Sequence, residues 1–144
     1  MRIRTITSRD IPAAAKVLRA EFGKPPYNET ASMPMVIKSL RHFLSLGTGF
    51  VALEKNQIVG VVYFRISQFW AGPTMEIEDL AVKDGFKGKG IGKKLLAKAE
   101  AFDRKKKVVH VLLITSRKAG TQSFYTQKGY QLMKDSIFFK KKLK

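Results

Sequence analysis

The feature that most constrains the fold is a strand-like segment that runs into a glycine-rich, basic loop at the start of a helix. The segment covers residues 76–82, and the loop follows after a short turn at residues 87–93. Glycines let the backbone approach a ligand closely, and the first turn of a helix offers N–H groups without intrahelical acceptors. The pattern therefore predicts a sheet strand, a phosphate-binding turn and a packed helix in succession.

Two better-known phosphate-binding loops do not fit this sequence. A Walker A loop needs a lysine and a serine or threonine after its second glycine; Gly85 and Gly90 have the required spacing, but isoleucine and glycine follow. A dinucleotide fingerprint fits Gly88 and Gly90 but meets Lys93 where its third glycine belongs. Neither kinase-like use of ATP nor nicotinamide binding is supported.

Composition narrows the class of protein. A chain of 144 residues is expected to form one domain, covering residues 1–144, with a single core. No apolar run reaches the ~18 residues of a membrane span, and the first residues lack an apolar signal core, so we expect a cytoplasmic protein without a membrane partner. The chain has no cysteine and two histidines, which excludes disulfides, thiolate zinc sites and a cysteine-linked acyl-enzyme, and we expect no metal.

Periodicity predicts alternating strands and helices. We expect a helix capped by Ser8 and ended before Gly23, a helix ended by Gly47, and a long helix after the glycine loop. The predicted strands cover residues 2–6, 50–54, 58–69, 75–82, 108–115, 130–133 and 136–141, and the predicted helices cover residues 34–46, 90–106 and 120–128. Residues 108–115 are the most apolar strand, which predicts a central position. The order indicates an α/β fold with helices on both faces of the sheet.

Two motifs carry a resemblance to a known family. The loop Lys87-Gly88-Lys89-Gly90-Ile91-Gly92 resembles the pyrophosphate loop of the GNAT superfamily of acetyl-CoA-dependent N-acetyltransferases, whose pattern is Gln/Arg-x-x-Gly-x-Gly/Ala. Residues 124–130 match the family's Phe-Tyr-x-x-x-Gly-Phe/Tyr motif. Each motif is moderately specific, but both occur in the family's order and spacing, and the resemblance spans essentially the whole chain.

The resemblance implies the GNAT fold, with a central mixed, mostly antiparallel, twisted sheet, and acetyl-CoA as cosubstrate. In the family, splayed central strands let the pantetheine arm pair with the strand before the loop. Carried over residue by residue, the cofactor-binding positions are Leu80, Ala81, Val82, Lys87, Gly88, Lys89, Gly90, Ile91, Gly92, Lys93, Lys118 and Phe124. Lys118 stands where members often carry asparagine.

Two side chains are candidates for the acetyl-transfer chemistry. Tyr125 is the candidate acid that protonates the departing thiolate, because a phenol is protonated at neutral pH and can donate one hydrogen bond. Glu78 is the candidate base for the amine, directly or through water. In an extended strand Glu76 and Glu78 would share one face and Asp79 would lie on the other.

The sequence constrains the identity of the acceptor less than that of the cosubstrate. The acidic side chains at positions 76, 78 and 79 favour a primary amine of a small molecule, such as an amino sugar, an amine or an amino acid. Residues 25–29 are expected to form part of an acceptor lid. A protein N-terminus or lysine is the alternative within the class. A non-catalytic module that binds CoA or RNA is the alternative from another class, since the net charge of +17 does not exclude nucleic acid. The oligomeric state stays open, a homodimer included.

Overall fold

The computed structural model describes residues 1–102 and 107–144, which divide into two units. The first unit is Met1–Ile114 and the second is Thr115–Lys144. The expectation of a single domain over residues 1–144 stays a prediction.

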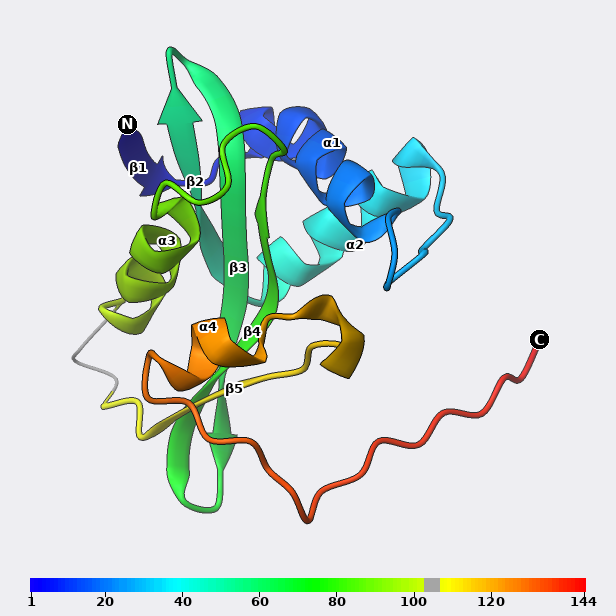
Figure 1. Cartoon of the computed structure of the whole chain (residues 1–144), viewed down its shortest axis with the longest axis vertical. Helices are drawn as coiled ribbons and strands as arrows, with labels where there is room; N and C mark the ends of the chain where they lie inside the picture. Colours follow the sequence, from blue (N-terminus) through cyan, green and yellow to red (C-terminus); the bar gives the residue numbers. More distant parts are fainter. Residues whose placement is uncertain (103–106) are drawn as a thin grey trace. The chain divides into compact units, whose positions relative to one another are not determined.

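A five-stranded mixed sheet forms the centre of the first unit (Figure 1). Its order follows the chain, β1-β2-β3-β4-β5; neighbours from β1 to β4 are antiparallel, and β5 runs parallel to β4. The sheet confirms the predicted mixed, mostly antiparallel α/β architecture. The strands are β1 Arg2–Thr5, β2 Thr48–Glu54, β3 Gln57–Phe69, β4 Gly72–Val82 and β5 His110–Leu113.

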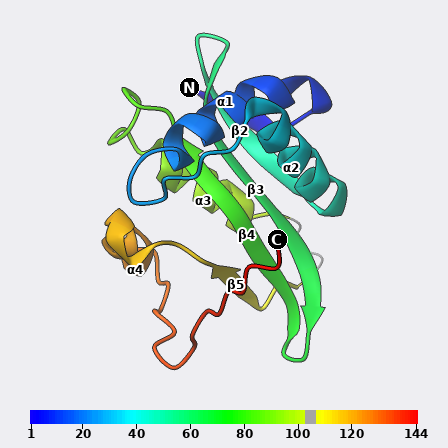
Figure 2. The ribbon, with the colours of Figure 1, turned by 90° about the vertical axis from the view of Figure 1, so that its right-hand side faces the viewer.

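Helices cover both faces of this sheet, as predicted. Helices α1 (Ile11–Phe22) and α2 (Met33–Leu46) lie on one face, and α3 (Ile91–Glu100) lies on the other (Figures 1 and 2). The alternation of side chains along β3 explains this, because successive residues point to opposite faces. Tyr63 belongs to the core beneath α1 and α2, whereas a Cβ added at Gly60 would lie 2.9 Å from Leu95 Cδ1 of α3.

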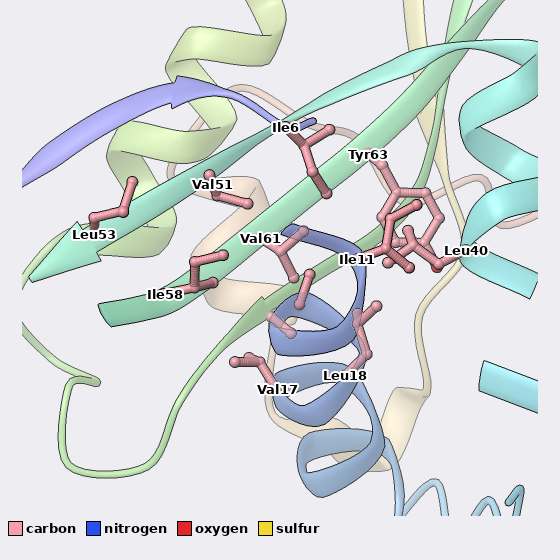
Figure 3. Close-up of a cluster of buried hydrophobic side chains, with 12 residues drawn as sticks. Ile6, Ile11, Val17, Leu18, Leu40, Val51, Leu53, Ile58, Val61 and Tyr63 are labelled. Atoms are coloured by element: carbon pink, nitrogen blue, oxygen red, sulfur yellow. The ribbon is translucent and has the colours of Figure 1, made fainter. Parts of the chain in front are cut away.

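The core beneath α1 and α2 fixes the face of the sheet on which the candidate site lies (Figure 3). Burying each large aliphatic side chain contributes about 1.5–3 kcal/mol. The residues labelled there come from both helices, the sheet and the turn after β1: Ile6, Ile11, Val17, Leu18, Leu40, Val51, Leu53, Ile58, Val61 and Tyr63. Tyr63 is the member with a polar end, and it leads from this core to the acidic residues of β4.

The start of α1 differs from the predicted cap. Ser8 lies in a 3-10 turn, Ser8–Asp10, whose N-cap is Thr7. The carboxylate of Asp10 accepts hydrogen bonds from the Thr7 amide at 2.8 Å and from both terminal nitrogens of Arg4 at 2.7 and 3.0 Å. Asp10 therefore forms a capping box with Thr7 and also joins β1 to the start of α1 through Arg4.

The predicted central position of residues 108–115 is wrong. Strand β5 has four residues, and in the described part of the chain it lies at the end of the sheet, beside β4. The centre is taken by β3, in which residues 58–64 are buried without interruption. An apolar run indicates that both faces of a strand are covered, but it does not indicate where the strand lies in the strand order of the sheet.

The predicted elements after β4 are longer than those observed. The helix expected over residues 90–106 ends at Glu100, and its positions 103–106 lie outside the described residues. The helix expected over residues 120–128 is α4, Gln122–Thr126. Residues 130–133 and 136–141 form no strand, which corrects that prediction. Their apolar side chains, Phe139 at 84% exposure among them, stay in solvent, and a strand needs both a partner and a buried face.

Candidate functional site

The glycine loop adopts a backbone conformation that favours glycine. Gly88 and Gly90 have φ angles of 76° and 80°, in the left-handed region that favours glycine. No heavy atom lies within 4 Å of a Cβ added at either position, so the loop faces open space rather than packed side chains. The amide of Lys94 donates to the Gly90 carbonyl at 3.0 Å, which begins the hydrogen-bond ladder of α3. The amides before Lys94 in the first turn have no intrahelical acceptor, so they are available to a ligand.

Both ends of the loop are held by the fold. The Lys83 amide donates to the Val59 carbonyl of β3 at 2.8 Å, which fixes the chain as it leaves β4. Ile91 is buried at 3% exposure, so its side chain anchors α3 to the sheet and leaves its backbone for any ligand contact. The lysines at positions 89 and 93 are exposed, and Lys89 lies over the Phe86 ring at 5.5 Å. The loop is therefore a preformed, positively charged turn.

Lys87 is engaged by carboxylates from two segments. Its ammonium lies 2.6 Å from Glu21 Oε1, at the end of α1, and 3.3 Å from Asp84 Oδ1. Lys24 contacts the same two carboxylates at 3.0 and 2.9 Å. Lys24, and then Lys87, lower the pKa of the Asp84 carboxyl by hydrogen bonding. These four residues form a charge network that links the glycine loop to the segment after α1.

One backbone edge of β4 is open beside the loop. Strand β5 pairs with β4 from Thr74 to Ile77 and no further. Residues 80–82 pair with β3 on the opposite edge, and no strand of the described residues covers their β5-side edge. The backbone groups of Leu80, Ala81 and Val82 on that side are therefore available to a ligand; these are the positions at which the family resemblance implies a pantetheine arm.

A β-bulge at Glu78 rearranges the acidic side chains. Asp79 pairs with Tyr63, but Ile77 pairs with Phe64, so Glu78 is an extra residue on β4. A bulge breaks the two-residue alternation. As a result, the side chains of Asp79 and Glu76 lie on the same face of the sheet. They share that face with their cross-strand partners on β3, at positions 63 and 65. The prediction that Asp79 would face away from Glu76 is wrong for this reason.

Asp79 is paired with the buried Tyr63. The Tyr63 hydroxyl, in a side chain with 3% exposure, donates a hydrogen bond to Asp79 Oδ2. Removal from water raises the pKa of Asp79 to about 7; the hydrogen bond from Tyr63 opposes the rise, and the charges of Glu78 and Glu29 add to it. Burial, and then the charge of Asp79, raises the pKa of Tyr63, which keeps the phenol a donor. Sequence reasoning missed this pair, although a tyrosine inside an apolar strand signals that its hydroxyl needs a partner.

Glu78 is exposed and lies beside an ion pair. Partial desolvation raises the pKa of Glu78; the charge of Arg65 opposes this rise, and that of Glu76 adds to it. Arg65 itself donates from Nε and a terminal nitrogen to Glu76 Oε2, at 3.1 and 3.0 Å. Because Glu76 holds Arg65, Glu78 makes no ion pair with any residue in the described part of the chain.

The second motif forms an aromatic cluster in the second unit. The ring of Tyr125 lies 5.0 Å from that of Phe124 and 5.6 Å from that of Tyr130, edge to face in both cases. The Tyr125 amide donates to the Thr121 carbonyl at 3.1 Å, within α4. Lys118 lies in a preceding 3-10 turn, where its amide donates to Ser116 Oγ at 3.2 Å.

Two hollows are found in the first unit. One, of about 510 Å³, lies at the β3–β4 hairpin beside Trp70, and another, of about 620 Å³, lies beside the end of α1 and includes Glu29. Neither contains Glu78 or the glycine loop. Within residues 1–102 and 107–144, no helix is long and apolar enough to span a membrane, and no group of three or more acidic or histidine side chains is placed to hold a metal ion.

Comparison with known proteins gives consistent results. The sequence profile of the acetyltransferase (GNAT) family matches residues 15–130. An uncharacterized N-acetyltransferase of Chlorobaculum tepidum is 31% identical over 107 residues, which is 74% of this chain and 61% of that relative's length.

Solved structures agree in fold. A "possible acetyltransferase" of Clostridium difficile 630 superposes with a TM-score of 0.85 over 99% of this chain and 98% of its own, at 15% identity. An aminoglycoside acetyltransferase from an uncultured soil metagenomic sample, solved in complex with trehalose, gives a TM-score of 0.77 over 99% of this chain and 96% of its own, at 24% identity.

Proposed function

The chain belongs to the acetyltransferase (GNAT) family, and from that premise we propose that it transfers the acetyl group of acetyl-CoA directly to a primary amine of a small molecule. One observation carries the proposal: an open backbone edge of β4 leads into a glycine loop with room for a ligand, and two carboxyls of β4, Glu78 and Asp79, form no ion pair within the described residues. The chain would accordingly act as an enzyme, and we place it in the cytoplasm.

The residues at the loop fit the phosphates and the arm of acetyl-CoA. Main-chain N–H groups of residues 88–93 would hold the pyrophosphate, with Lys87, Lys89 and Lys93 supplying positive charge. The open edge at residues 80–82 would pair with the pantetheine arm. From the second unit, Lys118 and Phe124 are proposed as further contacts.

The proposed chemistry assigns one proton to each catalytic side chain. Acetyl-CoA supplies an activated thioester, from which the acetyl group passes to the amine nitrogen as a C–N bond forms and the C–S bond breaks. Glu78 takes the proton that the amine loses, directly or through water. Tyr125 donates a proton to the sulfur that leaves. This direct transfer needs no acetyl-enzyme intermediate.

The charges near β4 support a cationic small-molecule acceptor. The charges of Glu78 and Glu29 both act on Asp79, and none of these three carboxyls forms an ion pair among the described residues, in a chain with 28 basic residues. An ammonium beside them would gain Coulombic stabilisation. The net charge of +17 would repel such a cation at long range, but salt screens that repulsion beyond ~8–10 Å. One solved structure with the same fold is that of an aminoglycoside acetyltransferase.

An acceptor panel tests the proposal. CoA thiol release would be measured at fixed salt with amino sugars and their phosphates, polyamines, aminoglycosides, free amino acids, N-terminal peptides and lysine peptides. Turnover with one small-molecule group, reduced in Glu78→Gln, is the expected result. Turnover with peptides and none with small amines would replace the proposed acceptor by a protein.

The same panel addresses a non-catalytic role. Bound acetyl-CoA without turnover on any acceptor would indicate a CoA-binding module. RNA binding would show an affinity that falls steeply with salt concentration, because lysines that contact phosphates release counterions.

A further inference from the structure

Asp79 is a half-buried carboxyl that the proposed proton transfers do not use. It is adjacent to Glu78 in the chain, and the bulge turns it toward the face that carries Tyr63. Its carboxylate accepts the Tyr63 hydroxyl but forms no ion pair within residues 1–102 and 107–144. A carboxyl removed from water without a cation is costly when ionised, so the fold maintains it at a price in stability.

Groups from three segments affect the charge of Asp79. Strand β3 contributes Tyr63, whose hydrogen bond favours the ionised carboxylate, and β4 contributes Glu78, whose charge disfavours it. The segment between α1 and α2 contributes Glu29, which also disfavours ionisation. Helix α2 contributes the uncharged Phe43, whose ring lies 6.0 Å from that of Tyr63.

The basic side chain whose charge reaches Glu78 already has an ion-pair partner. Arg65 faces Glu76 in a two-donor contact and reaches Glu78 only through its charge. Asp79 therefore has a phenol as its hydrogen-bond donor and two carboxyls as the charges that act on it, a setting in which an incoming ammonium would supply a counter-charge.

We propose that Asp79 and Tyr63 are a positioning pair that acts through Glu78, and that ionisation of Asp79 switches on the capture and deprotonation of the acceptor amine. This inference rests on the proposed function. The ionised Asp79 strengthens the attraction for an ammonium and raises the proton affinity of Glu78. The protonated Asp79 does neither, so the site works above the pH at which Asp79 loses its proton. Burial raises the pKa of Asp79 and so moves that pH upward, and Tyr63 moves it back down, since its hydrogen bond favours the charged carboxylate.

The test is the pH dependence of kcat/KM for the best acceptor of the panel. Wild-type enzyme should show an acidic limb with a midpoint near 7 and fall about tenfold per pH unit below it. Asp79→Asn should lose that limb and remain, at pH 8, about tenfold or more below wild type. Tyr63→Phe should keep the limb but move it to higher pH, because the bond that favours ionisation is removed.

Two variants separate this role from a structural one. Asp79→Glu restores a carboxyl and should restore an acidic limb, and Asp135→Asn, a change at an exposed aspartate of the second unit, should leave the profile unchanged. Acetyl-CoA affinity should be equal in all variants, since the pair is proposed to act on the acceptor. Carbon-13 NMR of labelled aspartate side chains would follow Asp79 directly, with a midpoint that rises in Tyr63→Phe.

The outcomes are distinguishable from failure of the proposed function. No turnover with any acceptor at pH 8 would refute that function, and the positioning role with it. Turnover with an acidic limb that persists in Asp79→Asn, or with no limb in wild type between pH 6 and 8, would overturn the inference and leave the proposed function standing.

Discussion

The ammonium of Lys87 lies 2.6 Å from a carboxylate oxygen of Glu21, and this contact ties the glycine loop to the end of α1. The lysine that the family resemblance assigns to the pyrophosphate thus has a carboxylate partner within the protein. A bound pyrophosphate and Glu21 would therefore compete for one positive charge.

Glu21→Gln should tighten acetyl-CoA binding. The change frees Lys87 from its nearest carboxylate, and we expect Kd to fall about two- to fivefold at low salt, since exposed ion pairs contribute about 0.2–1 kcal/mol. Isothermal titration calorimetry at low and high salt measures the effect, which should shrink as salt screens it. Glu54→Gln, which removes a carboxylate paired with the amino terminus of Met1, is the matched control. An equal gain in both variants would show that only net charge matters.

Gly88→Ala should weaken acetyl-CoA binding, whereas Gly85→Ala should not. Both glycines have positive φ, 76° and 87°, and neither has a neighbour within 4 Å of an added Cβ. Both changes should therefore cost a similar ~1–2 kcal/mol of strain. Only the first places a methyl group in the proposed pyrophosphate loop, so its Kd should rise about tenfold or more. Equal Kd values for the two variants would place the pyrophosphate elsewhere.

Tyr125→Phe should lower kcat about 10²-fold and leave the Kd of acetyl-CoA nearly intact. The phenol is proposed to protonate the departing sulfur, a step for which a general acid contributes about 10²–10⁴-fold. Tyr130→Phe is the control, because it removes a hydroxyl from the neighbouring ring of the same cluster, 5.6 Å away. Steady-state kinetics and calorimetry measure the two effects. Wild-type turnover in Tyr125→Phe would exclude the acid role.

Asp10→Asn should destabilise the fold in a pH-dependent way. Hydrogen bonding from Arg4, the largest cause, lowers the pKa of Asp10 to about 2. Because that pKa lies below its value of about 3.9 in an unfolded chain, the ionised form stabilises the fold above that value, and the contribution is lost as pH falls toward 2. We expect a loss of about 1–2 kcal/mol at pH 7 that vanishes near pH 2. Urea unfolding across that range checks it; a pH-independent loss would contradict the ion-pair account.

Local signals in the sequence were sufficient for the glycine loop, the C-terminal ends of α1 and α2 and the general architecture. Gly23 and Gly47 mark the ends of α1 and α2 as predicted. Gly90, at the start of α3, has a left-handed conformation, which a residue without a Cβ adopts readily.

Features that depend on pairing between distant residues could not be predicted. The bulge at Glu78 arises from the register between β3 and β4, and the alternation of residues within β4 gives no sign of it. The Tyr63–Asp79 pair joins residues from different strands for the same reason. The place of β5 across the sheet depends on which strands compete for the centre, which its own apolar run does not report.

The central claim is direct transfer of an acetyl group to a small primary amine. Mass spectrometry would follow carbon-13-labelled acetyl-CoA mixed with wild-type protein and the amine panel, with Glu78→Gln beside it. The account predicts that the label appears as an amide on a small amine, not on the protein, and more slowly with Glu78→Gln. Label that stays in acetyl-CoA, or appears only on peptides or on the protein itself, would contradict it.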